Sequence, residues 1–144
     1  MIDVETLFRT ALLLAGAGHF VLLGASVQVP ARLRWREELA RLSPFNRKLM
    51  WTYGGFTVLT IVAFGTLTLM LREEMLRGDR AAVALAAFIG LYWLARILVD
   101  VFWLGHSGWP RGRALVVGHA LLAALFAFLA ATYLGLVLRQ IALR

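Results

Sequence analysis

Apolar residues are gathered into four long runs along the chain, and short polar connections separate these runs. A helix needs about 20 apolar residues to cross a bilayer, and each run reaches that length. A transmembrane helix also satisfies its backbone hydrogen bonds internally, as the lipid interior requires. The pattern therefore predicts four membrane-spanning helices, over residues 7–29, 45–71, 81–105 and 114–138.

Residues with known preferences for helix ends mark the borders of these runs. Ser43 and Pro44 predict a helix start, because serine caps exposed amides and proline suits the first helical position. Gly78 and Asp79 predict a helix stop followed by a new N-cap, and Pro30 is expected to close the first span. Since short connections make successive helices antiparallel, we predict an all-α integral membrane protein. It is a single antiparallel bundle of four transmembrane helices that covers residues 1–144.

Two segments need separate consideration. Residues 31–42 carry several charges, with Trp35, Leu39 and Leu42 at helical spacing, so a short interfacial helix and a solvated charged loop both remain open. The first run could also belong to a signal peptide. The residues before it are acidic, however, whereas a signal peptide begins with basic residues, so we expect a retained helix.

Composition supports a membrane setting and narrows the chemistry. Hydrophobic residues make up 61% of the 144-residue chain, whereas soluble domains contain about 45–50%. The net charge of +7 comes mainly from basic residues in the connections, which favours contact with anionic lipid headgroups over nucleic-acid binding. The chain has no cysteine, which excludes disulfides and cysteine nucleophiles.

Lysine and arginine are distributed unevenly between the two sides of the predicted bundle. The side with loops 31–48 and 106–113 carries eight of them, and the opposite side carries six. By the positive-inside rule, these loops are expected in the cytoplasm and both termini outside. The layout resembles that of small four-helix proteins of bacterial membranes, so a bacterial inner membrane is the expected location.

The most unusual polar residues are Arg96 and Asp100, which lie four residues apart inside the third run. A charge at such depth costs about 2.5 kcal/mol or more, and this spacing places both side chains on one helix face. One interpretation is an ion pair that fixes helix packing. Another is that Arg96 holds an anionic or carbonyl group of a ligand while Asp100 orients it. Arg96 could also extend toward the membrane surface.

Other polar and aromatic residues form stripes that we expect to face the bundle interior, because lipid cannot pair with hydroxyl or imidazole groups. The stripes contain Tyr53, Thr57, Thr60, Phe64 and Thr68 in the second span, Phe88, Tyr92, Arg96, Asp100 and Trp103 in the third, and His119, Phe126 and Tyr133 in the fourth. A rise of about 1.5 Å per residue places most of these polar groups in the cytoplasmic half, with His19 and Arg96 near the midplane. This arrangement predicts a polar pocket that opens toward the cytoplasm. Small residues would allow close helix approach, among them Gly16, Gly18, Gly54, Gly55, Gly118 and Ala123.

His19 and His119 are the histidines within the predicted spans. Imidazole is a common haem ligand, so the pair could hold a b-type haem if the two helices are neighbours. A divalent metal on His19, His119 and Asp100 is a further option, although nothing in the spacing supports it. In the simplest interpretation, each histidine forms a hydrogen bond across the bundle.

The chain lacks the hydrolase elbow, the zinc-protease helix, the phosphate loop and the dinucleotide fingerprint, so an enzymatic role is not predicted. We expect a small membrane protein that holds a lipophilic ligand or cofactor, a quinone or haem, in the polar pocket. The predicted ligand-binding residues are Arg96, Asp100, His19, His119, Tyr53, Thr57 and Tyr92. The alternatives are a non-catalytic accessory subunit of a larger membrane complex and proton-coupled transport by a homo-oligomer.

Overall fold

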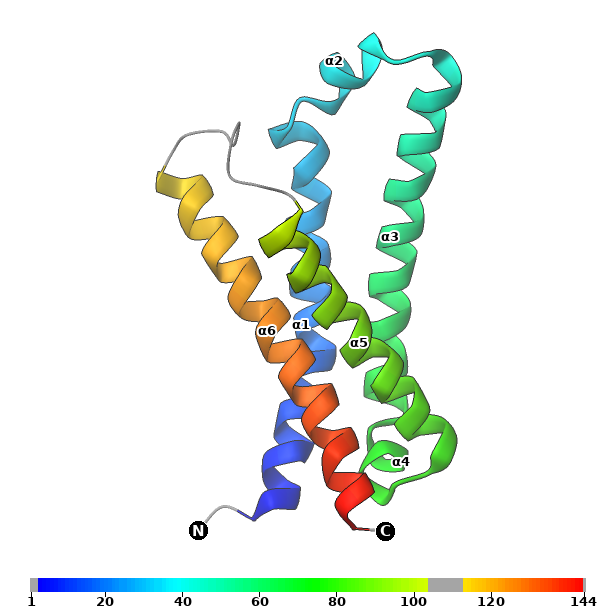
Figure 1. The fold of residues 1–144 in the computed structure, drawn as a ribbon, viewed down its shortest axis with the longest axis vertical. Coiled ribbons are helices and arrows are strands. Elements are labelled where there is room, and N and C mark those ends of the chain that lie inside the picture. The colour runs from blue at the N-terminus through cyan, green and yellow to red at the C-terminus, as the bar shows by residue number, and fades with distance from the viewer. Residues whose placement is uncertain (1–2, 104–112, 144) are drawn as a thin grey trace.

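The computed structural model describes residues 3–103 and 113–143, in which four long helices form the body of the protein (Figure 1). The long helices are α1 (Val4–Arg32), α3 (Pro44–Met70), α5 (Arg80–Phe102) and α6 (Arg113–Ala142). Short helices occupy two of the connections, namely α2 (Trp35–Glu38), the 3-10 helix η1 (Leu39–Arg41) and α4 (Arg72–Arg77). The long helices alternate in direction, so both termini lie at one end of the bundle (Figure 1).

All four long helices contain a segment that is long and apolar enough to cross a membrane. Their outer surfaces are apolar as well: Val21, Phe56 and Leu121 are 70%, 62% and 67% exposed. In a bilayer such side chains contact lipid tails that are as apolar as they are. The predicted fold class, a bundle of four antiparallel helices of transmembrane type, is confirmed, and so is the short helix in the first loop.

Two of the predicted helix ends are confirmed in detail. The Ser43 side chain accepts a hydrogen bond from the Asn46 amide at 3.4 Å, and Pro44 is the first residue of α3. Gly78 ends α4 with a φ of +83°, a left-handed conformation that glycine adopts without steric cost. Most of loop 106–113, including His106, lies outside the described residues.

Pro30 does not close the first helix as expected. It lies within the last turn of α1, and the Leu33 amide still donates to the Val29 carbonyl at 2.9 Å. A proline so near the end removes only one amide donor, so the helix continues to Arg32. The chain then turns at Arg34, which has a φ of 51°.

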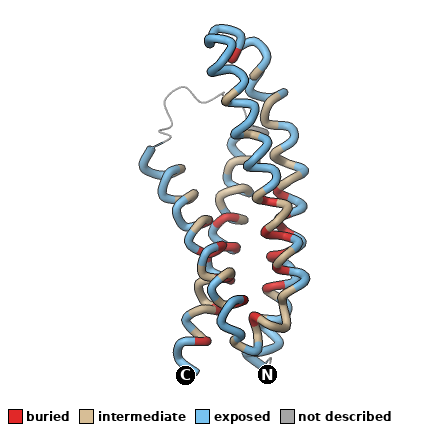
Figure 2. Tube along the Cα trace, turned by 90° about the vertical axis from the view of Figure 1, so that its right-hand side faces the viewer, coloured by how far each residue is buried: buried red, intermediate tan, exposed pale blue. Residues whose placement is uncertain are grey.

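Burial divides the bundle into two halves (Figure 2). All four long helices contribute buried residues in the half nearest the termini, which we call the packed half; they include Leu12, His19, Phe64, Thr68, Ala86, Trp93, Phe126 and Tyr133. The other half, which we call the open half, comprises residues 23–32, 44–60, 94–102 and 116–125. None of these residues is buried. The core therefore occupies only part of the bundle's length.

Glycines form the closest helix crossings in the packed half. A Cβ atom at Gly65 of α3 would lie only 3.2 Å from the carbonyl oxygen of Gly16 in α1. A Cβ atom at Gly90 of α5 would lie 3.1 Å from the Cβ of Tyr133 in α6. The expected close approach is wrong for two glycines of the open half, where such an atom would meet nothing within 4 Å: Gly55 and Gly118.

Polar contacts close the end of the packed half. The Gln140 side chain donates to the carbonyl oxygens of Met75 and Leu76 at 3.1 and 2.7 Å, which fastens α4 to α6. Arg9 of α1 pairs with Glu73 of α4 at 2.6 Å. Partial desolvation opposes ionisation of the Glu73 carboxyl, but hydrogen bonds and charge from its arginine neighbours outweigh it and hold its pKa below the usual value.

Candidate functional site

A buried histidine occupies the centre of the bundle, where the packed half meets the open half. The His19 side chain has no exposed surface. Its Nδ1 lies 2.7 Å from the Ala15 carbonyl oxygen, and the Trp93 indole donates to its Nε2 at 3.0 Å. Because an indole N–H can only donate, Nε2 is the acceptor and Nδ1 carries the proton. Both ring nitrogens of His19 are therefore engaged within the protein.

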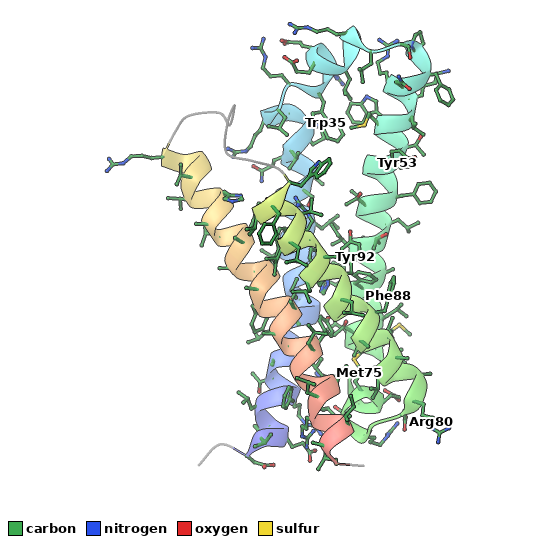
Figure 3. The ribbon with its side chains drawn as sticks, viewed as in Figure 1. Trp35, Tyr53, Met75, Arg80, Phe88 and Tyr92 are labelled. Atoms are coloured by element: carbon green, nitrogen blue, oxygen red, sulfur yellow. The ribbon has the colours of Figure 1, made fainter. Side chains whose placement is uncertain are left out.

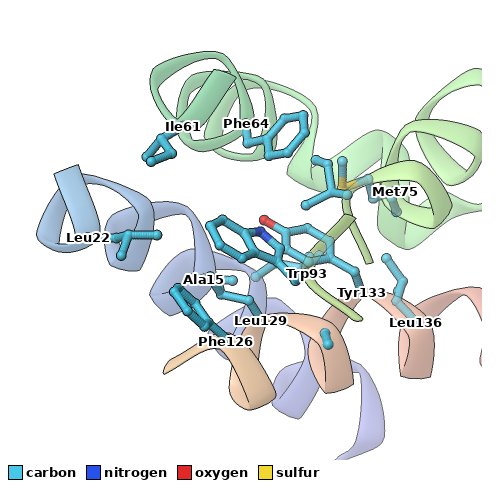
Figure 4. Close-up of a cluster of buried hydrophobic side chains, with 14 of the residues drawn as sticks. Ala15, Leu22, Ile61, Phe64, Met75, Trp93, Phe126, Leu129, Tyr133 and Leu136 are labelled. Carbon is cyan, nitrogen blue, oxygen red and sulfur yellow. The ribbon is translucent and has the colours of Figure 1, made fainter. Parts of the chain in front are cut away.

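Aromatic rings from the other three long helices contact this histidine. Figure 4 shows Phe64, Trp93, Phe126 and Tyr133 within the surrounding cluster of buried side chains. Phe64 and Tyr133 present ring edges to His19 at centroid distances of 6.0 and 6.1 Å. The Trp93 ring stacks on Phe126, with centroids 5.1 Å apart and planes 19° from parallel. The Tyr133 hydroxyl is 2.6 Å from that of Thr68, so it too is satisfied. We call His19, Phe64, Tyr92, Trp93, Phe126 and Tyr133 the aromatic layer.

A cavity of about 160 Å³ lies between the four long helices, against the aromatic layer and within the open half. Its polar groups come from Ser26, Thr57, Tyr92 and Arg96. Its apolar lining consists of Leu22, Ala25, Val29, Ile61, Trp93, Leu122 and Phe126. The cavity thus combines an aromatic base, aliphatic sides and a small number of hydrogen-bonding groups, which is the usual composition of a small-molecule site.

Arg96 supplies the positive charge at this cavity. Its guanidinium carbon lies 5.5 Å from the centroid of the Phe126 ring, which is within the range of a cation–π contact. Its closest carboxylate contact is to Asp100, at 3.9 Å, and 39% of the side chain is exposed. This separation is too long for a direct hydrogen bond. The guanidinium donors therefore remain suited to an acceptor on a ligand.

Asp100 is closer to a residue on the neighbouring helix. One of its carboxylate oxygens lies 3.3 Å from Nε2 of His119 in α6, whereas the other faces Arg96. Only 13% of the Asp100 side chain is exposed. The carboxylate thus joins α5 to α6 in the open half, next to the cavity rather than in its lining.

The structure brings together only part of the predicted ligand-binding set. Thr57, Tyr92 and Arg96 line the cavity, and Asp100 and His119 form the pair beside it. His19 lies behind Trp93, in the buried layer. Tyr53 is 59% exposed and lies outside the lining.

The two histidines have separate environments. His19 is held by Ala15 and Trp93, and His119 by Asp100. His19 contacts Trp93, and the α6 residue at the level of Trp93 is Phe126. His119 lies seven residues before Phe126, which is about 10 Å away along α6. The geometry does not place the two imidazoles on one haem iron. Among the described residues, no three histidine, aspartate or glutamate side chains form a group suited to a metal ion.

The predicted inner face of α5 is wrong at two positions. Phe88 and Trp103 are 60% and 84% exposed, whereas Trp93, which lies off the predicted stripe, is 2% exposed. Small residues explain the difference, because Ala82, Ala86 and Gly90 follow a four-residue spacing and let α5 pack closely on α6. Trp93 lies on the same face as these small residues. Their four-residue spacing was therefore the sequence signal that could have identified Trp93 as buried. Ser26 carries no comparable signal.

Comparisons with protein families, with curated proteins and with solved structures give no match for this chain.

Proposed function

We propose that the protein binds a quinone-type ligand, a membrane-soluble molecule with a planar ring and carbonyl oxygens, in the cavity of the open half. This proposal is based mainly on the position of Arg96. Its guanidinium group lies at an aromatic cavity, within the span of the bundle, and its 3.9 Å contact with Asp100 is longer than a hydrogen bond. A charge held at that depth is expensive, and intramembrane charges commonly mark binding sites or ion paths.

Cavity size favours a quinone ring over haem. An engineered cavity of about 150 Å³ is known to admit benzene, so the observed 160 Å³ suits one six-membered ring. A porphyrin is several times larger than such a ring. Haem ligation would also require His19 to give up the hydrogen bond that it accepts from Trp93.

The chemistry of the lining suits a ring with carbonyl groups. Trp93 and Phe126 present aromatic surfaces against which a planar ring can stack. Arg96 can donate to one carbonyl oxygen and the Tyr92 hydroxyl to another, whereas the Thr57 hydroxyl already donates to the Tyr53 carbonyl of its own helix at 2.9 Å. The positive-inside count predicts that this site lies in the cytoplasmic half of the membrane.

Retention of quinone during purification tests this function. The wild type and two arginine variants are purified in mild detergent, extracted with organic solvent and analysed for quinone per protein. We expect the wild type and Arg36→Ala to retain quinone, because Arg36 is an exposed residue of α2. Arg96→Ala should lose it while eluting as the same folded species. Equal retention by Arg96→Ala and the wild type would refute the assignment.

The alternative function, a non-catalytic accessory subunit of a larger membrane complex, could use the Arg96–Asp100 pair to dock onto another protein. In the structure, Asp100 already contacts His119 within the chain. Ligand binding explains more features of the site than docking does, because it accounts for Arg96, the aromatic surfaces and the cavity together.

A further inference from the structure

A second hollow adjoins the cavity on the surface of α5. It has a volume of about 380 Å³ and is lined by Tyr92, Ala95, Arg96 and Val99. Tyr92 and Arg96 also line the first cavity, so the two hollows meet at these side chains. We call the second hollow the α5 groove.

The α5 groove lies on the side of α5 that faces α3. Figure 3 shows Phe88 and Tyr92 on adjacent turns of α5. Their rings contact the Phe64 ring of α3 at centroid distances of 5.9 and 5.1 Å. Further into the open half, Ala95 and Val99 are exposed, and so is Phe56 of α3. In a membrane the groove is therefore open to lipid, and its floor beyond Arg96 is apolar.

We infer that the α5 groove holds the hydrophobic tail of the ligand, which enters sideways from the bilayer between α3 and α5. This inference rests on the proposed function and extends it to a ligand class, quinones that carry an isoprenoid or alkyl chain. A cavity of about 160 Å³ suits one ring, so an isoprenoid or alkyl chain attached to that ring would lie outside it. Tyr92 and Arg96 border both hollows, so we place the exit of the chain from the cavity into the groove at these two side chains.

Lateral entry also fits the solubility of such a ligand. A chain that stays in the bilayer avoids the cost of exposing its methylene groups to water. The small side chain of Ala95 leaves room for the tail beside Arg96, and Val99 continues the apolar floor by one turn. Tyr92 and Arg96 would then contact the ligand where its ring and its tail join.

Two benzoquinone probes separate the ring site from the tail site. One is 2,3-dimethoxy-5-methyl-1,4-benzoquinone, and the other is the same ring with a decyl chain. Equilibrium binding of each is measured on the purified full-length chain in one detergent. The variant Val99→Phe fills the α5 groove, and Val101→Phe is the matched control, because Val101 is 58% exposed on the same helix but lies outside the groove lining.

We expect Val99→Phe to weaken binding of the decyl probe by about tenfold, because the phenylalanine ring would occupy the space in which the decyl chain lies. Binding of the ring alone should be unchanged, which also shows that the variant is folded. Val101→Phe should resemble the wild type with both probes. Unchanged binding of the decyl probe to Val99→Phe would overturn the inference and make the groove an ordinary lipid-facing surface. If both probes bind Arg96→Ala as they bind the wild type, or if neither binds the wild type, the proposed function itself fails.

Discussion

His19 and Trp93 show how polar groups are accommodated in the middle of this apolar bundle. The indole N–H of Trp93 has the histidine as its acceptor, and the histidine's own proton is directed to the Ala15 carbonyl. Neither group is left without a partner, which would be costly where no water is available. Arg96 differs from both, because its contacts within the chain are longer and it borders a cavity. This contrast is why we assign His19 to structure and Arg96 to binding.

Removing the indole donor should therefore weaken the bundle. Trp93→Phe leaves Nε2 of His19 without its donor and reduces the stacking area on Phe126. We expect the free energy of unfolding in detergent to fall by about 1 kcal/mol, a typical size for a hydrogen bond between membrane helices. The matched control is Trp103→Phe, because Trp103 is 84% exposed and its replacement should be neutral. Equal stability of the two variants would show that the His19–Trp93 bond contributes nothing.

Helix crossings are the main feature at the scale of elements. α1 packs chiefly on α3, and α5 chiefly on α6. Both pairs cross closely at glycines of the packed half, Gly65 with Gly16 in one and Gly90 against Tyr133 in the other. Without a hydrophobic force between helices in lipid, such close backbone approach is a principal source of association.

Alanine substitutions at glycine should accordingly affect stability in the packed half but hardly in the open half. Gly65→Ala and Gly90→Ala place a Cβ atom within 3.2 Å of neighbouring atoms, so each should destabilise the bundle by about 1–3 kcal/mol. Gly55→Ala and Gly118→Ala meet nothing within 4 Å and should be neutral or slightly stabilising. The check is thermal unfolding of all four variants in one detergent. A uniform effect would contradict the division into packed and open halves.

The contact between α1 and α4 should make stability depend on pH. Glu73 has a lowered pKa in the folded protein, so its stabilising effect is complete above the usual glutamate pKa of about 4.3. The effect is lost as the pH falls through the lower, folded-state value. We expect Glu73→Gln to be less stable than the wild type at neutral pH, and the difference to shrink at acidic pH. A difference that does not change with pH would show that the Arg9–Glu73 charge pair is not its source.

At the scale of the whole molecule, the bundle is closed at the end with the termini and loosely packed at the other. The buried residues of the four long helices, the closest glycine crossings and the Arg9–Glu73 and Gln140 contacts lie in the packed half. The cavity, Arg96 and the Asp100–His119 pair lie in the open half. In the proposed site, the packed half supplies the aromatic base and the open half supplies the space for a ligand.

Much of this architecture was predictable from the sequence, because its signals are local. The lengths of the apolar runs predicted the four helices, and Ser43 and Gly78 predicted helix ends that the structure contains. The side of each helix that faces the bundle interior was harder to predict, since it depends on the helix against which it packs. On α5 the conspicuous residues, from Phe88 to Trp103, suggested an inner face, whereas small residues determine the actual one. Three members of the cavity lining, Thr57, Tyr92 and Arg96, were nevertheless predicted as ligand-binding residues.

The fluorescence of single tryptophans can report directly whether a quinone occupies the cavity beside Arg96. In one variant Trp93 alone is kept, and in a second Trp103 alone, with the other tryptophans replaced by phenylalanine. Each is titrated with the decyl benzoquinone, which quenches indole on contact. We predict saturable quenching of Trp93, which lines the cavity, and its loss in Arg96→Ala. The exposed Trp103 should show only linear collisional quenching. Linear quenching of equal slope at both positions would contradict the existence of a quinone site at Arg96.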